Sequence, residues 1–236
     1  FTKISKTSNI YIEQCFNLGL NLMSKYKLKF LINGPVSKNQ FLKKKFPGIT
    51  EYVAKKTNSK DPVMLIYNKN LSVSPLTTHI PIKKVSEFIK KKKIIDNIIK
   101  INNFYKKTLY KKPKIAVLGL NPHCETIDKI SEEDTEIIPA IKLLKKKKLK
   151  VSGPISADTF FVKKNIKEFD VVVGMYHDQV LTPLKLLFEF EAINVTIGLP
   201  FIKITPDHGP NYNMIGGNKS DPSSIFYAFN FIKNMK

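Results

Sequence analysis

The four histidines are the side chains of this sequence best suited to chemistry. They are His79 in LTTHIPI, His123 in GLNPHCE, His177 in MYHDQ and His208 in PDHGP. Neutral imidazole is the commonest metal ligand in proteins, and a site with three histidines leaves positions open for a substrate. A lone histidine is more often a satisfied core or surface residue, but several in turns beside Pro, Asp or Thr favour a shared site. Their spacing matches no short metal-binding motif, so spacing alone leaves both readings open.

Two turns could bind an anion. NGPVSK (33–38) and SGP (152–154) follow expected strands and could present backbone N–H groups, although simple tight turns explain them equally well. No GxGxxG follows a strand, and neither a GxxxxGK[ST] phosphate loop nor a GxSxG elbow occurs. The standard dinucleotide fingerprint is therefore missing, and periodicity leaves the cofactor undecided.

The elements that must position these residues alternate along the chain. Apolar periodicity predicts helices over 8–27, 50–56, 85–110, 131–148 and 223–234, and strands over 29–34, 63–67, 115–120, 149–152, 171–176 and 193–197. Buried strands separated by helices indicate an α/β fold with largely parallel pairing. His123 and His177 each follow an apolar run, and groups just past the carboxyl ends of such strands line the ligand crevice.

Composition limits the class of protein. The 236 residues are 42% hydrophobic, enough for one large domain or two small ones. A net charge of +21 would suggest nucleic acid, yet all 40 basic residues are lysines and the chain has no Trp. Nucleic-acid sites favour the arginine fork and interleaved aromatics. We therefore expect solvated lysine faces and no nucleic-acid partner.

The cellular setting follows from what the sequence contains. No apolar run approaches the ~18 residues of a membrane helix, and the first residues do not read as a secretory signal. Cys15 and Cys124 form neither a disulfide framework nor a CxxC clip. These features favour a cytoplasmic protein with no membrane partner.

Seven motifs together resemble one enzyme family, the 4-hydroxythreonine-4-phosphate dehydrogenases. In the family's order they are NGPVSK (33–38), FPGITEY (46–52), TTHIPI (77–82), GLNPH (119–123), SGPISADTFF (152–161), DVVVGMYHDQ (170–179) and NVTIGLPFIKITPDHG (194–209). No single motif would be specific, but the ordered set is.

The resemblance implies an NAD-dependent oxidation in pyridoxal 5′-phosphate biosynthesis. The substrate is 4-(phosphooxy)-L-threonine, and its product, 2-amino-3-oxo-4-(phosphooxy)butanoate, decarboxylates to 3-amino-2-oxopropyl phosphate. The implied fold is similar to isocitrate and isopropylmalate dehydrogenases, with two α/β domains and a cleft between them. Residues 1–45 and 215–236 would form part of a first, incomplete domain. Residues 46–214 would form a second domain carrying metal, substrate and dimer contacts.

The resemblance also assigns residues to the site. It implies a homodimer in which histidines from both subunits hold a divalent cation (Zn, Mg, Mn or Co), and by motif these are His79, His123 and His177. A Lewis acid on the substrate hydroxyl would lower its pKa and stabilise alkoxide character as hydride leaves. The implied substrate contacts are Thr50, Lys185, Asn194 and Lys203. Asp158 and Asp178 match catalytic acidic residues that orient ligands or relay protons, and His208 and Gly209 resemble the nucleotide-binding loop.

This chain departs from the family at named positions. Ile49 replaces a usual histidine, and Lys203 replaces a usual arginine, which exchanges a fork for a point charge. The family's first strand and Gly-Asp-Pro-rich loop have no counterpart here. Two alternatives therefore stay open. One is a related metal-dependent dehydrogenase of another phosphorylated or acidic 3-hydroxy acid, and the other is a non-catalytic binding protein of the same fold.

Overall fold

The chain forms two compact units, which are described separately below. The computed structural model describes residues 6–42, 45–127, 130–189, 191–206, 209, 214 and 216–235. The first unit comprises residues 1–62 and 190–234, and the second comprises residues 63–189 with 235–236. Residues 46–62 and 190–214, which we expected in the second domain, thus cluster with the first unit. The expected division into domains, 1–45 with 215–236 and 46–214, stays a prediction.

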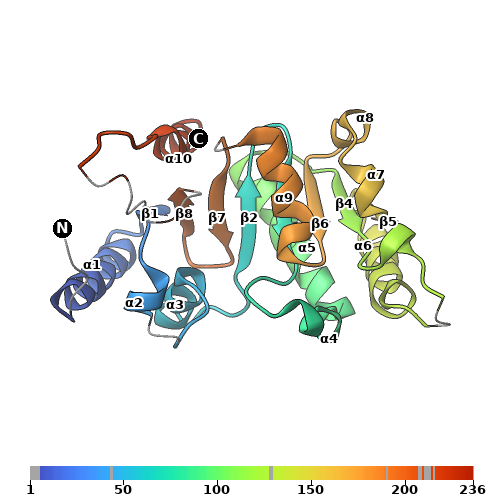
Figure 1. Ribbon diagram of the computed structural model, residues 1–236, viewed down its shortest axis with the longest axis horizontal. Coiled ribbons are helices and arrows are strands. Elements are labelled where there is room, and N and C mark those ends of the chain that lie inside the picture. Colours follow the sequence, from blue (N-terminus) through green and yellow to red (C-terminus); the bar gives the residue numbers. More distant parts are fainter. Residues whose placement is uncertain are drawn as a thin grey trace. The chain divides into compact units, whose positions relative to one another are not determined.

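The first unit has three strands and, among its described residues, four helices (Figure 1). β8 (Ile202–Pro206) runs parallel to β1 (Phe30–Ile32) and antiparallel to β7 (Ile193–Ile197). The helices are α1 (Lys6–Lys25), α2 (Lys38–Phe41), α3 (Ile49–Lys56) and α10 (Ser223–Lys233). Phe16 of α1 and Tyr52 of α3 meet edge to face, and both lie in one buried apolar cluster. This cluster anchors the start of α3.

The described residues of the second unit form five strands in the order β2-β3-β6-β4-β5. They are β2 (Val63–Tyr67), β3 (Ser72–Pro75), β4 (Ile115–Leu118), β5 (Val151–Ile155) and β6 (Val171–Gly174). β2 and β3 are antiparallel, whereas β3–β6, β6–β4 and β4–β5 are parallel. The expected α/β class with largely parallel pairing is confirmed. Every residue of β3, β4 and β6 is buried, so this sheet forms the core of the unit.

Helices cover the strands of the second unit on both faces. Figure 1 shows α9 (His177–Phe188) in front of them and the paler α5 (Lys91–Thr108) behind. The other helical segments are η1 (Ile82–Lys84), α4 (Val85–Phe88), η2 (Pro122–Cys124), η3 (Glu133–Ile137), α6 (Ile138–Lys146), α7 (Ala157–Phe160) and α8 (Lys163–Ile166).

The prediction of a single helix over 85–110 was wrong. It is broken into α4 and α5 by extended backbone at Ile89 and Lys90. Ile89 and Ile94 are both completely buried, and five residues apart they would lie on different faces of a continuous helix. The break brings both side chains into the core. A Glu136 carboxylate oxygen then accepts the Lys91 amide at 2.5 Å, which satisfies one free N–H at the start of α5.

The elements that were not predicted from the sequence include β3, β8 and α9. β3 has the sequence SVSP, whose serines do not suggest a buried strand. It is nevertheless fully buried, because both serine hydroxyls make hydrogen bonds. Ser72 accepts from the Tyr105 hydroxyl at 2.8 Å, and Ser74 donates to the Met64 carbonyl at 2.8 Å. A buried hydroxyl with a partner costs little, so the strand needs no apolar run.

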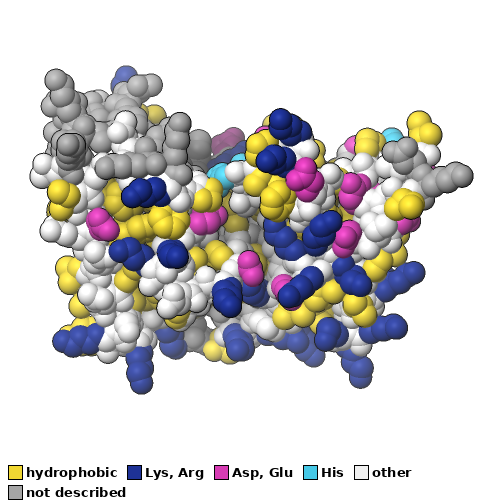
Figure 2. Space-filling view, turned by 90° about the horizontal axis from the view of Figure 1, so that it is seen from below, with side chains coloured by type: hydrophobic (Ala, Val, Ile, Leu, Met, Phe, Trp, Pro, Cys, Tyr) yellow, Lys and Arg dark blue, Asp and Glu magenta, His cyan; other side chains and the backbone are white. Residues whose placement is uncertain are grey.

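The surface in Figure 2 carries lysines interspersed with acidic and apolar side chains, without one continuous basic patch on the face in view. This distribution favours solvated lysines on that face. No helix in the described part of the chain is both long and apolar enough to cross a membrane.

Candidate metal and substrate site

The three histidines expected to bind metal follow three neighbouring strands of the second unit. His79 comes after β3, His177 after β6 and His123 after β4. Because β3, β6 and β4 are parallel neighbours, their carboxyl ends meet at one edge of the sheet. The topology therefore brings the loops that carry these histidines to the same edge.

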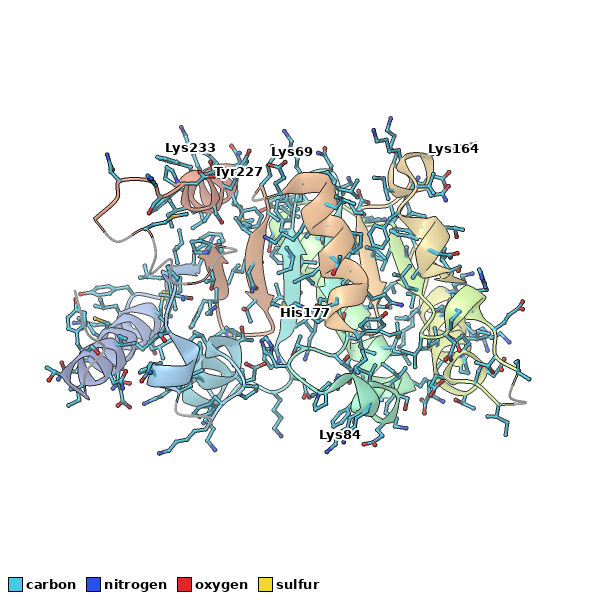
Figure 3. The ribbon with its side chains drawn as sticks, viewed as in Figure 1. Lys69, Lys84, Lys164, His177, Tyr227 and Lys233 are labelled. Atoms are coloured by element: carbon cyan, nitrogen blue, oxygen red, sulfur yellow. The ribbon has the colours of Figure 1, made fainter. Side chains whose placement is uncertain are left out.

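His79 and His177 lie side by side. Their ring centroids are 6.1 Å apart and the ring planes are inclined by 38°. His177 is the first residue of α9, at the lower end of that helix in Figure 3. Its Nδ1 lies 2.6 Å from Asp178 Oδ1. With Nδ1 engaged by a carboxylate, Nε2 is the nitrogen left for a metal, the usual arrangement of a ligating histidine.

His123 has a different environment. It lies in η2 with φ 55°, and Cys124 follows with φ 60°, so two consecutive non-glycine residues occupy the left-handed region. The His123 side chain is 74% exposed, and its Nδ1 lies 3.7 Å from Asp158 Oδ2, an ion-pair distance rather than a hydrogen bond. The Ser156 hydroxyl above all holds the pKa of Asp158 below its ordinary value, and His123 contributes. His123 and Asp158 thus form a second imidazole–carboxylate pair.

The donor chemistry fits a divalent cation only in part within one chain. Two neutral imidazoles, one of them backed by a carboxylate, suit Zn²⁺ and related ions. Yet in the described ranges no three His, Cys, Asp or Glu side chains gather into a group able to hold a metal ion. His79 and His177 would supply two ligands, and a third would have to come from elsewhere.

Three of the four residues expected to bind substrate lie in the first unit, namely Thr50 on α3, Asn194 on β7 and Lys203 on β8. Thr196 pairs with Lys203, and Asn194 pairs with Thr205 across the antiparallel ladder. Residues directly opposite share a face, and so do residues two apart on one strand. These four polar side chains therefore line one face of the two strands.

Hydrogen bonds extend this polar face. The Lys203 ammonium, on a residue only 2% exposed, donates to Thr205 Oγ1 at 2.6 Å, and that hydroxyl donates to Asn33 Oδ1 at 3.0 Å. Thr50, in the first turn of α3, lies 3.3 Å from Thr196, oxygen to oxygen. Asn194 Oδ1 is buried and has no hydrogen-bond partner in the part of the chain described. A buried acceptor without a partner is costly, which points to a donor on a ligand.

The remaining predicted positions are less informative. Lys185 is half-buried on α9, in the second unit together with His177. His208 lies outside the described residues. Gly209 is exposed, and no described atom lies within 4 Å of the place where a Cβ would be. Ile49 is buried in the apolar cluster beside Tyr52, so this departure from the family serves the core.

Sequence reasoning missed several polar residues around the site, namely Thr77, Glu133, Gln179, Thr196 and Thr205. Thr196 and Thr205 could have been found from the alternation of polar and apolar residues in NVTI and IKIT. Thr77, Gln179 and Glu133 make hydrogen bonds to backbone groups distant in sequence. No local pattern reveals those.

Glu133 is a buried carboxylate, 1% exposed, that holds the loop before His123. Its Oε1 accepts the backbone amides of Leu120 and Asn121 at 2.7 and 2.9 Å, and its Oε2 accepts Asn121 Nδ2 at 2.7 Å. Burial raises the pKa of Glu133, but these hydrogen bonds to the ionised form outweigh burial and leave the pKa below its ordinary value.

Replacing Glu133 with Gln is expected to lower the free energy of unfolding by about 1–3 kcal/mol at neutral pH, because an uncharged side chain must meet three donors. A lowered folded-state pKa stabilises the protein above the ordinary carboxyl pKa of 4.5, and this contribution is lost as the pH falls through the lowered value. The difference between wild type and variant should therefore shrink in acid. Urea unfolding at several pH values measures it, with Glu125→Gln, an exposed neighbour, as the control. A difference that stays constant down to strongly acidic pH would contradict the assignment.

The chain matches one protein family over most of its length. The family described as "Pyridoxal phosphate biosynthetic protein PdxA" matches residues 1–232. A 4-hydroxythreonine-4-phosphate dehydrogenase of Sulfurihydrogenibium is 43% identical over 227 residues, covering 94% of this chain and 69% of the relative. A D-threonate 4-phosphate dehydrogenase of Pectobacterium atrosepticum is 36% identical over 181 residues, covering 76% of this chain and 56% of that protein.

Solved structures agree on the fold. A crystal structure of 4-hydroxythreonine-4-phosphate dehydrogenase from Klebsiella pneumoniae has a TM-score of 0.83 at 29% identity, over 97% of this chain and 71% of that one. An isocitrate dehydrogenase from Methylococcus capsulatus, with a TM-score of 0.56 at 11% identity, shares the fold alone. The chain spans between about half and three quarters of the length of these proteins.

Proposed function

Because this chain belongs to the family of the pyridoxal phosphate biosynthetic protein PdxA, we propose that it oxidises 4-(phosphooxy)-L-threonine as part of a dehydrogenase. The 3-hydroxyl becomes a ketone as hydride passes to NAD, and the resulting 3-oxo acid loses carbon dioxide. The observation that carries the proposal is the pair of adjacent imidazoles, His79 and His177, with Asp178 behind His177.

A divalent cation, when bound, would polarise the substrate hydroxyl and later the ketone oxygen. We assign His79 and His177 of one chain and His123 of a second chain as its ligands, in a homodimer. Asp178 Oδ1, 2.6 Å from His177 Nδ1, would accept a hydrogen bond from that nitrogen and so leave Nε2 to ligate. Asp158 would hold His123 in the same way once that ring is engaged.

The polar face of the first unit would bind the rest of the substrate. The buried Lys203 ammonium suits a phosphate dianion. Its hydrogen bond to Thr205, which in turn donates to Asn33, fixes the direction of the lysine side chain. Asn194 Oδ1 needs a donor, which a dianionic phosphate cannot supply but a substrate ammonium or hydroxyl can. Thr50 and Lys185 complete the proposed contacts, and the loop at His208 and Gly209 would contact NAD. This enzyme would work in the cytoplasm, without nucleic acid.

A second candidate is the oxidation of D-threonate 4-phosphate. It is favoured by the relative of that name and by Ile49, whose burial in the core removes a polar contact usual in the family. This substrate carries a hydroxyl in place of the amino group, so the two candidates differ next to the reacting carbon.

A direct comparison of substrates tests the proposal. We expect the full-length protein, loaded with Zn²⁺ or Mg²⁺, to form NADH from 4-(phosphooxy)-L-threonine with kcat/KM at least about tenfold above that for D-threonate 4-phosphate. Tenfold corresponds to about 1.4 kcal/mol in the transition state. A reversed ratio would establish the second candidate. Turnover of neither substrate by metal-loaded protein would leave a binding protein of this fold.

A further inference from the structure

The backbone of Met175 and the side chain of Gln179 together join three loops that each lead to a histidine. Met175 is fully buried at the end of β6, two residues before His177. Its N–H donates to Gln179 Oε1 at 2.7 Å. Its carbonyl accepts both the backbone N–H and the hydroxyl of Thr77, at 3.2 and 2.7 Å. Thr77 itself lies two residues before His79.

Gln179 continues this junction to the third loop. Its Nε2 donates to the Gly119 carbonyl at 2.8 Å, four residues before His123. One side chain therefore connects the end of β6 to the end of β4. Gly174 makes room for it, because a Cβ there would lie 3.0 Å from Gln179 Oε1 and would also collide with Val180. Such a contact is tighter than ordinary packing allows.

None of these bonds is needed to build the sheet, whose strands are already paired to one another. They act beyond the strand ends, where they fix the loops relative to each other. Thr77, 2% exposed, holds the His79 loop against the His177 loop, and those are the two loops whose imidazoles lie together. Metal ligands must hold their distances within a few tenths of an ångström, so a small slip of either loop weakens the site.

We propose that Thr77 and Gln179 are positioning residues that set the spacing of the histidine loops, and through it the affinity for the divalent ion. The inference rests on the proposed function, since it takes His79, His123 and His177 as ligands. Groups behind metal ligands typically change metal affinity by about 10–100-fold when they are removed. Thr77→Val keeps the shape and the backbone bond but removes the hydroxyl. Gln179→Met keeps the length but removes both side-chain bonds.

The test measures binding of Zn²⁺ to the metal-free, full-length protein by competition with a chelator. We expect Thr77→Val and Gln179→Met each to weaken Zn²⁺ binding by about 10–100-fold. We also expect a changed visible spectrum of bound Co²⁺, which reports ligand geometry. Thr57→Val is the matched control for threonine, because Thr57 Oγ1 likewise donates to a carbonyl, that of Val53 at 3.0 Å, at the end of a helix that carries no histidine. Gln14→Met, an exposed position on α1, is the control for glutamine. Both controls should bind Zn²⁺ like wild type.

A purely structural role gives a different result. Variants that melt earlier without metal, yet bind Zn²⁺ with wild-type affinity and show the wild-type Co²⁺ spectrum, would overturn the inference. Should Gln179→Met fail to fold, Gln179→Glu retains the acceptor for the Met175 N–H and loses the donor to Gly119, and wild-type affinity there would be equally decisive. Wild-type protein that binds no Zn²⁺ at all would instead refute the proposed metal site, which separates the two failures.

Discussion

Replacing His177 with Ala is expected to remove the metal ion and to lower kcat/KM by roughly a thousandfold. Polarisation of the substrate oxygen by a bound cation contributes several kcal/mol to the transition state, and each 1.36 kcal/mol is tenfold in rate. Among the proposed ligands, His177 has the best-defined support, since its Nδ1 lies 2.6 Å from Asp178 Oδ1 and its ring lies beside His79. Elemental analysis of purified protein and NADH formation measure the two losses.

A graded control distinguishes a lost ligand from a damaged fold. Asp178→Asn keeps an oxygen near Nδ1 but removes the charge, so we expect a loss of about 10–100-fold in metal affinity. Asp178 is exposed, so neither variant should change the melting temperature of the metal-free protein by much. A His177→Ala protein that retained a full complement of metal and wild-type turnover would exclude His177 as a ligand.

Mixing inactive variants is expected to restore activity in two pairings and not in the third. His79 and His177 lie together in one chain, whereas His123 faces Asp158. In the proposed shared site, a mixed dimer of His123→Ala with His79→Ala, or with His177→Ala, has one site with both defects and one site intact. Random reassociation makes half of the dimers mixed, so about a quarter of wild-type activity should return under two-fold symmetry.

The third pairing is the internal control. A dimer of His79→Ala with His177→Ala has one defect in each site, so no activity should return. A tagged partner must demonstrate that subunits exchange. No recovery in any pairing, with exchange demonstrated, would place each site within one chain. Recovery in the third pairing would show that these two imidazoles serve different sites.

Apolar runs predicted the strands β2 and β7 residue for residue, because their side chains are mostly buried against apolar neighbours. The same reasoning missed β3, since Ser72 and Ser74 are buried polar side chains whose partners, Tyr105 and Met64, lie elsewhere in the sequence. It missed β8 because the charged residue Lys203 is buried within that strand, with its ammonium bonded to Thr205. The break at Ile89 depended on the core that both halves of the expected helix must reach. Burial that is decided by tertiary contacts leaves no local signature.

The candidate site, too, was predictable where a local motif existed and not where tertiary contacts decide the geometry. The motifs identified the histidines and the family, and both the resemblance and the α/β fold are confirmed by the comparisons. The approach of His79 to His177 could not be predicted, because it depends on β3 lying beside β6, and β3 itself was not recognised. The bond of Thr77 to the Met175 carbonyl depends on the same pairing, and the bond of Gln179 to the Gly119 carbonyl depends on β4 lying beside β6.

The division of the chain into units also has a consequence for synthesis on the ribosome. The strands of the second unit all lie within residues 63–174, a continuous stretch of the sequence. This stretch can pack while later residues are still being made. The first unit is discontinuous, because the partner that the structure describes for β1 is β8, which leaves the ribosome much later. Until then, the apolar cluster around Phe16 and Tyr52 lacks Phe201 and stays open to other chains. We therefore expect chaperones to act on the nascent first unit during that interval.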